Sequence, residues 1–172
     1  MVSKESKSNP PAPIYLQMRQ RVLETDPGTV GIHPSDAAPQ VWGVLMEFMT
    51  GGTHVTLVSL VDGTTSLYFG NGGGIIGGGG DAHMAQASRD LNVMAESYLD
   101  DFVLEVDLRL PAKGETRFII LTYDGTYVSE IQQSRLFKGN HLLTPLFNLS
   151  NRVISMLRVL QESSEKKSTQ EK

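Results

Sequence analysis

The residues whose types and spacing could bind a small molecule lie in one glycine-rich segment. Eight of the 17 glycines fall between Gly70 and Gly80, and Gly72-Gly-Gly-Ile-Ile-Gly77 has the G-x-G-x-x-G spacing of dinucleotide-binding loops. In such loops glycine permits a tight turn and lets a pyrophosphate approach the N-terminus of the following helix. Asp81 and His83 follow the segment directly and could stand at the rim of the same site.

Several observations oppose a nucleotide site here. A segment with this many glycines fits the G-x-G-x-x-G spacing by chance. The next helix is also expected to begin several residues after the motif. No Lys-Ser/Thr pair follows, as a Walker-type loop requires. Asp81, the expected N-cap, also places negative charge where an anion would bind.

Two hypotheses remain: a crossover in which glycine allows close packing or forms a flap, or an anion or nucleotide site. The candidate residues of that site are Gly72, Gly74, Gly77, Gly78, Asp81 and His83.

The other polar residues form no pattern that indicates catalysis. The four histidines lack the i, i+4 spacing of a helical metal site, and no Gly-x-Ser-x-Gly elbow occurs. The carboxylate pair Glu105 and Asp107 is expected on the wet face of a strand, where charged side chains are usual. The sequence therefore predicts no metal, no cofactor and no catalytic residue.

The bulk properties indicate a cytoplasmic protein with one domain. The chain has 172 residues, is 40% hydrophobic and carries a net charge of −4, and its Lys and Arg residues form no stripe that would bind nucleic acid. It contains no cysteine, and its apolar runs are too short to cross a membrane. We expect disordered tails at 1–13 and 161–172 around a domain at 14–160.

Hydrophobic periodicity predicts the elements of this domain. Alternating residues around Asp62-Gly63 and Asp124-Gly125 predict two hairpins. Asp36 as a cap and Pro39 in a first turn predict a helix near 36–50. The expected helices are 14–25, 36–50, 81–102 and 144–160, and the expected strands are 54–61, 64–69, 104–110, 116–123 and 126–133. This order, α-α-β-β-α-β-β-β-α, predicts an α+β fold: a five-stranded, mostly antiparallel sheet covered by helices.

The first hairpin carries a resemblance to a known family. Val58-Ser-Leu-Val-Asp-Gly-Thr-Thr-Ser-Leu67 resembles the hairpin of roadblock (dynein light-chain type) domains, and the element order from Gln40 to Leu160 resembles that family and the wider profilin-like group. The resemblance implies a non-enzymatic, dimeric adaptor or regulator.

The final helix has more apolar positions than one narrow stripe needs. The surplus is buried either by the N-terminal helix or by a protein partner such as a second copy. The candidate interface residues are Trp42, Met46, Met49, Leu149, Met156 and Leu160. We therefore expect a non-catalytic, homodimeric binding or regulatory module. The alternatives are a ligand-binding protein or enzyme that uses segment 70–80, and a protein that neutralises a toxin or nuclease through an acidic face.

Overall fold

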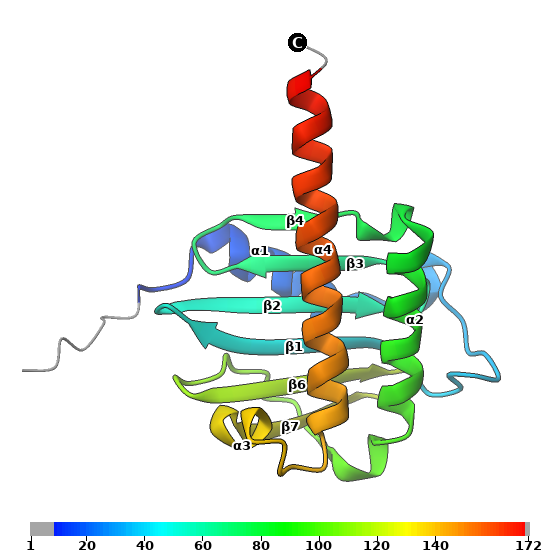
Figure 1. The fold of residues 1–172 in the computed structure, drawn as a ribbon. Helices are drawn as coiled ribbons and strands as arrows, with labels where there is room; N and C mark the ends of the chain where they lie inside the picture. Colours follow the sequence, from blue (N-terminus) through cyan, green and yellow to red (C-terminus); the bar gives the residue numbers. More distant parts are fainter. Residues whose placement is uncertain (1–8, 171–172) are drawn as a thin grey trace, which may run out of the picture.

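A computed structural model describes residues 9–170 and shows one seven-stranded sheet with helices on both faces (Figure 1). The strand order is β4-β3-β2-β1-β6-β7-β5, and every neighbouring pair is antiparallel. The strands are β1 (Val41–Thr50), β2 (Thr53–Leu60), β3 (Thr65–Phe69), β4 (Gly74–Ile76), β5 (Val103–Leu104), β6 (Glu115–Thr122) and β7 (Thr126–Gln132). The α+β class is confirmed, whereas the predicted five strands and their order are not.

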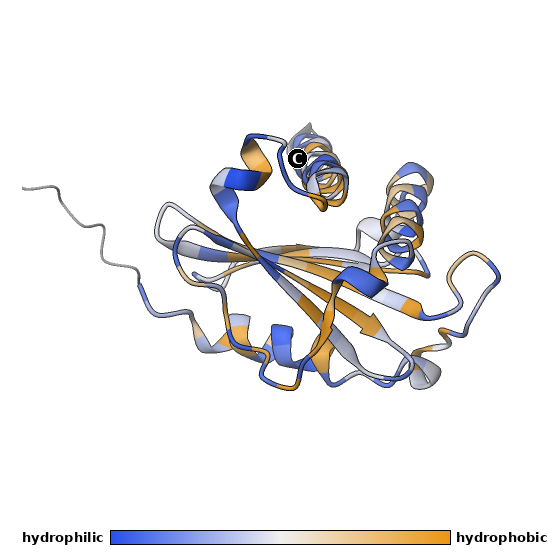
Figure 2. Ribbon diagram, turned by 90° about the horizontal axis from the view of Figure 1, so that it is seen from below, coloured by the Kyte–Doolittle hydropathy of each residue, from blue (hydrophilic) through white to orange (hydrophobic). Residues whose placement is uncertain are grey.

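The helices lie on opposite faces of this sheet. They are α1 (Pro13–Leu23), α2 (Ala82–Glu96), the short α3 (Gln133–Phe137) and α4 (Thr144–Gln170). Helices α2 and α4 cover one face and α1 lies on the other (Figure 2), so each face has its own apolar core. Within residues 9–170, no helix combines the length and apolar character that crossing a bilayer requires.

The predicted helix at 36–50 is wrong, because this segment is the central strand β1. β1 pairs with β2 on one side and β6 on the other, and all residues from Val41 to Glu47 are buried. A strand buried on both faces is apolar at nearly every position, so its residues also satisfy a helical spacing. The element order on which the roadblock and profilin-like resemblance rests is therefore not found, although the hairpin β2–β3 is present.

The remaining predicted strands and helices agree better with the structure. Both Asp-Gly hairpins are confirmed, as β2–β3 and β6–β7. The N-terminal helix is confirmed as α1, and Asp81 caps α2 as expected, accepting a hydrogen bond from the Met84 amide at 2.9 Å. α2 ends at Glu96 rather than near 102, and a 3-10 turn, η3 (Leu99–Asp101), follows.

The predicted strand at 104–110 is largely a loop. Only Val103–Leu104 pair with β7, while Leu108 and Leu110 pack on the α1 side of the sheet. The predicted buried face is therefore only half present, because Leu104 and Val106 of the same alternation are 59% and 93% exposed. Side chains rather than a strand partner hold the backbone of this segment. We call residues 105–112 the strap.

The final helix is longer than predicted. It continues from 160 to Gln170 and projects beyond β4 at the edge of the sheet (Figure 1). Residues 161–170, expected to be a disordered tail, are therefore helical. Of the expected N-terminal tail, residues 9–12 precede α1 without regular secondary structure. Residues 1–8 and 171–172 lie outside the described residues.

Candidate functional site

The glycine-rich segment is a structured crossover along one sheet edge. It forms a turn, then strand β4, then the 3-10 turn η2 (Gly78–Gly80), and it ends at the Asp81 cap of α2. Gly78 is buried, and a Cβ there would lie 2.6 Å from Cδ2 of Leu157. A Cβ on Gly79 would lie 3.1 Å from the Gly63 carbonyl oxygen. Close packing therefore explains glycine at these two positions.

The six candidate ligand residues do not share one site. Gly72 lies next to α1, where an added Cβ would approach Ile14 to 3.0 Å. Gly74 is in β4, where a Cβ would lie 2.9 Å from the Leu67 carbonyl oxygen. Only Gly77, Gly78, Asp81 and His83 lie near the two concavities beside α4.

The first concavity lies between the end of the glycine-rich segment and α4. Its volume is about 280 Å³, and the residues that line it are Ile75, Ile76, Gly77, Gly78, Gly80, Asp81, Leu157, Leu160, Gln161 and Ser164. Asp81 is the charged residue among them. Its carboxylate already accepts the Met84 amide, so the group that would meet a ligand here is a capping carboxylate. This arrangement disfavours a phosphate.

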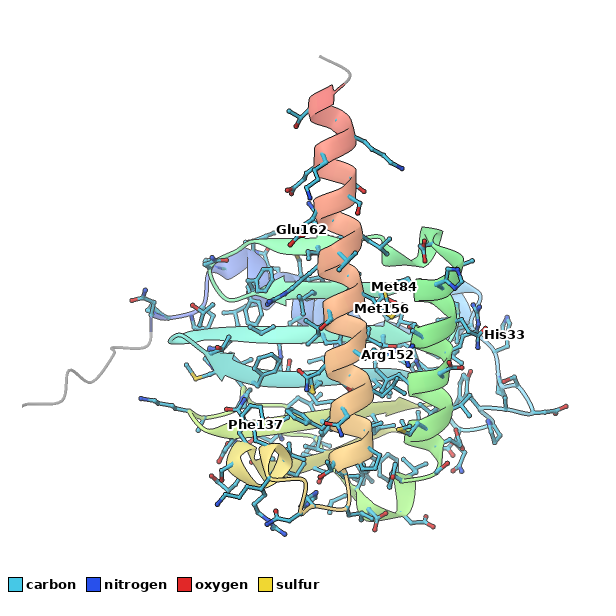
Figure 3. All side chains as sticks on the ribbon, in the orientation of Figure 1. His33, Met84, Phe137, Arg152, Met156 and Glu162 are labelled. Carbon is cyan, nitrogen blue, oxygen red and sulfur yellow. The ribbon has the colours of Figure 1, made fainter. Side chains whose placement is uncertain are left out.

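The second concavity is a more apolar groove between the N-terminus of α2 and α4. Its volume is about 370 Å³, and we define this α2–α4 groove by Asp81, His83, Arg152, Ser155, Met156, Val159 and Leu160. Figure 3 shows Arg152 and Met156 on the side of α4 that faces α2. Val159 is 61% exposed, so an apolar side chain lies open to solvent beside the groove.

The candidate interface residues divide between surface and core. Trp42 and Met46 are only 3% and 0% exposed, because β1 is the central strand and not a surface helix. Met49 and Leu149 are half-buried. Met156 and Leu160, also half-buried, line the α2–α4 groove and are the two that lie at a concavity.

A buried ionic cluster lies on the opposite face, beneath α1. Glu47 on β1 is fully buried and accepts two hydrogen bonds from Arg19 of α1, at 2.6 and 2.8 Å. Thr56 donates to the same carboxylate at 3.0 Å and shares a 2.7 Å hydrogen bond with the Tyr15 hydroxyl. Burial, reinforced by the nearby negative charge of Glu47, raises the pKa of Tyr15 to about 12.

The strap is held by side-chain hydrogen bonds to its backbone carbonyls. Arg19 donates to Leu108, the buried Arg117 donates to Asp107 and Arg109, and a ring nitrogen of His54 lies 3.1 Å from the Pro111 oxygen. The sequence pattern does not reveal the buried ionic cluster, because a helix, a strand and a loop that are far apart in sequence form it. The pattern around Glu47 also predicts a helix, whereas Glu47 lies in β1.

The acidic side chains and histidines of residues 9–170 form no metal-binding cluster. Within residues 9–170, no group of three or more His, Asp or Glu side chains is placed to hold a metal ion. The buried ion pair of Glu47 and Arg19 lies beneath α1, on the other face of the sheet from the α2–α4 groove.

No family model matches this chain, and no curated protein and no solved structure matches it either.

Proposed function

We propose that this chain is a non-catalytic protein-binding module that works as a homodimer in the cytoplasm. The observation that carries the protein-binding role is the α2–α4 groove, an open and largely apolar surface beside the 61% exposed Val159. Exposed apolar grooves between helices fit an amphipathic segment of another protein, with polar rims that fix its orientation. His83, Asp81 and Arg152 supply such a rim.

The ionic chemistry of the molecule supports a binding role. The buried carboxylate of Glu47 and the guanidinium of Arg19 form a two-point ion pair, which contributes to the packing of α1 on the sheet. Neither side chain is free to exchange a proton with a substrate. The residues around the groove offer shape and apolar contact, which suit recognition.

Site-specific photo-crosslinking in cells tests the binding role. A photoreactive amino acid at Val159 is expected to capture a discrete protein partner, while the same group at Val30, 53% exposed on η1 (Pro27–Val30), serves as the matched control. Met156→Glu is expected to abolish the capture by placing charge in the groove. Equal labelling from Val159 and Val30, or capture that survives Met156→Glu, would contradict the proposed groove.

A small-ligand site at the glycine-rich segment is the second candidate. The concavity of about 280 Å³ beside Gly77 and Gly78 favours it. Thermal-shift measurements against nucleotides and phosphorylated metabolites test it, with Gly80→Gln as the blocking variant. Gly80 is the suitable position because its backbone is ordinary and an added Cβ meets nothing within 4 Å, whereas Gly77 has φ of 88°. A ligand-induced rise in the melting temperature that is lost in Gly80→Gln supports the ligand site. If none of the compounds raises the melting temperature, the ligand site is contradicted.

A further inference from the structure

Strand β4 is the three-residue edge strand at one end of the sheet. It pairs with β3 through Gly74, Ile75 and Ile76, and within residues 9–170 no strand covers its outer side. Proteins blunt such an edge by keeping the strand short or by adding charge, proline or a covering element, because its free backbone groups can pair with another chain. β4 uses only the first of these along its outer side, since it has three residues. Residues 70–80 contain neither charge nor proline, and Ile76 is 68% exposed.

Helix α4 crosses this edge and continues past it. Leu157, Leu160, Gln161 and Ser164 line the same concavity as Ile75 and Ile76, so the helix passes β4 near residues 160–161. The next ten residues, 161–170, project beyond the sheet (Figure 1), a distance of about 15 Å. That length spans about three further strands at their usual spacing.

The crossing point lies within a stripe of opposite charges. Arg158, Glu162 and Glu165 follow each other at steps of four and three residues, which places them on one face of α4. Figure 3 shows Glu162 on the side of the helix away from α2, where α4 passes β4. All three side chains are exposed, and neither Arg158 nor Glu162 has an ion-pair partner among the described residues.

We propose that a second copy of this chain pairs with the first along β4, antiparallel and edge to edge, with the two α4 helices side by side. This inference rests on the homodimer proposed above and identifies its interface. In an antiparallel helix pair that crosses at residues 160–161, Arg158 lies opposite the partner's Glu162 and within one turn of the partner's Glu165. Two-fold symmetry repeats the contact, so each copy supplies both charges.

Self-complementarity distinguishes a second copy from other occupants. An extended peptide could also pair with β4, but it would leave the charge stripe and the projecting helix without partners. The second copy uses the strand edge, the exposed Ile76 and both signs of charge at once. Its own projecting helix lies beside the first copy's α4, on the face away from the α2–α4 groove, so the groove stays accessible.

Charge reversal tests the interface by sedimentation velocity on the full chain. Arg158→Glu makes all three positions of the stripe negative, and the double variant Glu162→Arg, Glu165→Arg makes all three positive. Lys166, which lies beside Glu162 and Glu165, is unchanged in both variants. Each variant alone is expected to weaken the homodimer at least about tenfold, because like charges then face each other. An equimolar mixture of the two is expected to form a heterodimer of about wild-type affinity. Circular dichroism confirms that each variant is folded, since all three positions are exposed.

A matched pair of edge variants tests β4 itself. Ile76→Lys is expected to weaken the dimer at least about tenfold, whereas Val106→Lys, at a 93% exposed position near the opposite edge, leaves it unchanged. A wild-type dimer that resists Ile76→Lys and the charge reversals would overturn this interface while the homodimer stands. A wild-type monomer at every concentration would overturn the homodimer and, with it, this interface.

Discussion

At the scale of single residues, the buried ionic cluster beneath α1 places a charged pair inside the core. Glu47 is fully buried, and its carboxylate receives hydrogen bonds from Arg19 and Thr56. A buried charge without its partner is strongly destabilising, whereas an apolar pair of similar volume is often tolerated. The cluster therefore ties α1 to the sheet in one position.

Replacing Arg19 alone should lower the free energy of unfolding much more than replacing both Arg19 and Glu47. We expect Arg19→Met to lower the free energy of unfolding by about 3–5 kcal/mol, because Glu47 is left buried without its cation. Arg19→Met with Glu47→Leu should recover most of that loss. Urea unfolding of both single variants and the double variant measures the coupling. Additive effects would show that the two side chains act independently.

Tyr15 should make stability depend on alkaline pH. Its pKa is about 12 in the folded protein and about 10 in an unfolded chain, so the folded state holds the proton more tightly. This contribution is fully present below pH 10 and is lost as the pH rises from 10 to 12, by about 2–3 kcal/mol. Between pH 10 and 12, the free energy of unfolding should fall more steeply for the wild type than for Tyr15→Phe. Identical slopes would contradict the assignment.

At the scale of elements, the secondary structure of β1 and of the strap depends on their neighbours in the fold more than on their local sequence pattern. β1 is buried on both faces, and the resulting apolar run also satisfied a helical period. The strap has the alternation of a strand, but Arg19, Arg117 and His54 bind its carbonyls in place of a strand partner. Secondary structure at both segments depends on what lies beside them.

In the 3-10 turn η2, close packing around Gly78 predicts that even an added methyl group lowers stability. Gly78→Ala should lower the free energy of unfolding by about 1–3 kcal/mol, because the new methyl group would overpack Leu157 and Met84. Gly80→Ala, two residues away in open space, should change it by no more than about 0.5 kcal/mol. Thermal or urea unfolding of the pair gives the comparison, and equal stabilities would argue against close packing at Gly78.

At the scale of the whole molecule, the sheet separates the ionic cluster under α1 from the binding surfaces around α4. The apolar core that includes Leu157 packs α4 on the sheet, whereas residues 161–169 are all exposed. The docked part of α4 therefore supports the fold, and the projecting part is available for assembly.

Truncation should separate these two roles. A chain that ends at Leu160 is expected to keep its monomer stability within about 0.5 kcal/mol, because the deleted described residues make no buried contact. Its dimer should weaken at least about tenfold through loss of Glu162 and Glu165. Denaturant unfolding in an Ile76→Lys background reports the monomer, and sedimentation reports the dimer. A large loss of monomer stability would assign the projecting helix a structural role.

Features that depend on neighbours along the chain follow directly from the amino-acid sequence. Asp-Gly turns between alternating residues predicted both hairpins, and Asp81 before an apolar stripe predicted the cap of α2. Local hydrogen bonds and turn geometry depend on a few consecutive residues, which is why these predictions hold.

Features that depend on residues far apart in sequence became visible in the folded structure. It made β1 a central strand, united Arg19, Glu47 and the strap in one cluster, and placed Met156 in a groove while burying Trp42 and Met46. It also divided the glycine-rich segment between close packing at Gly78 and an open hollow at Gly80. Each outcome depends on which segments meet across the sheet, and no short stretch of sequence contains that information.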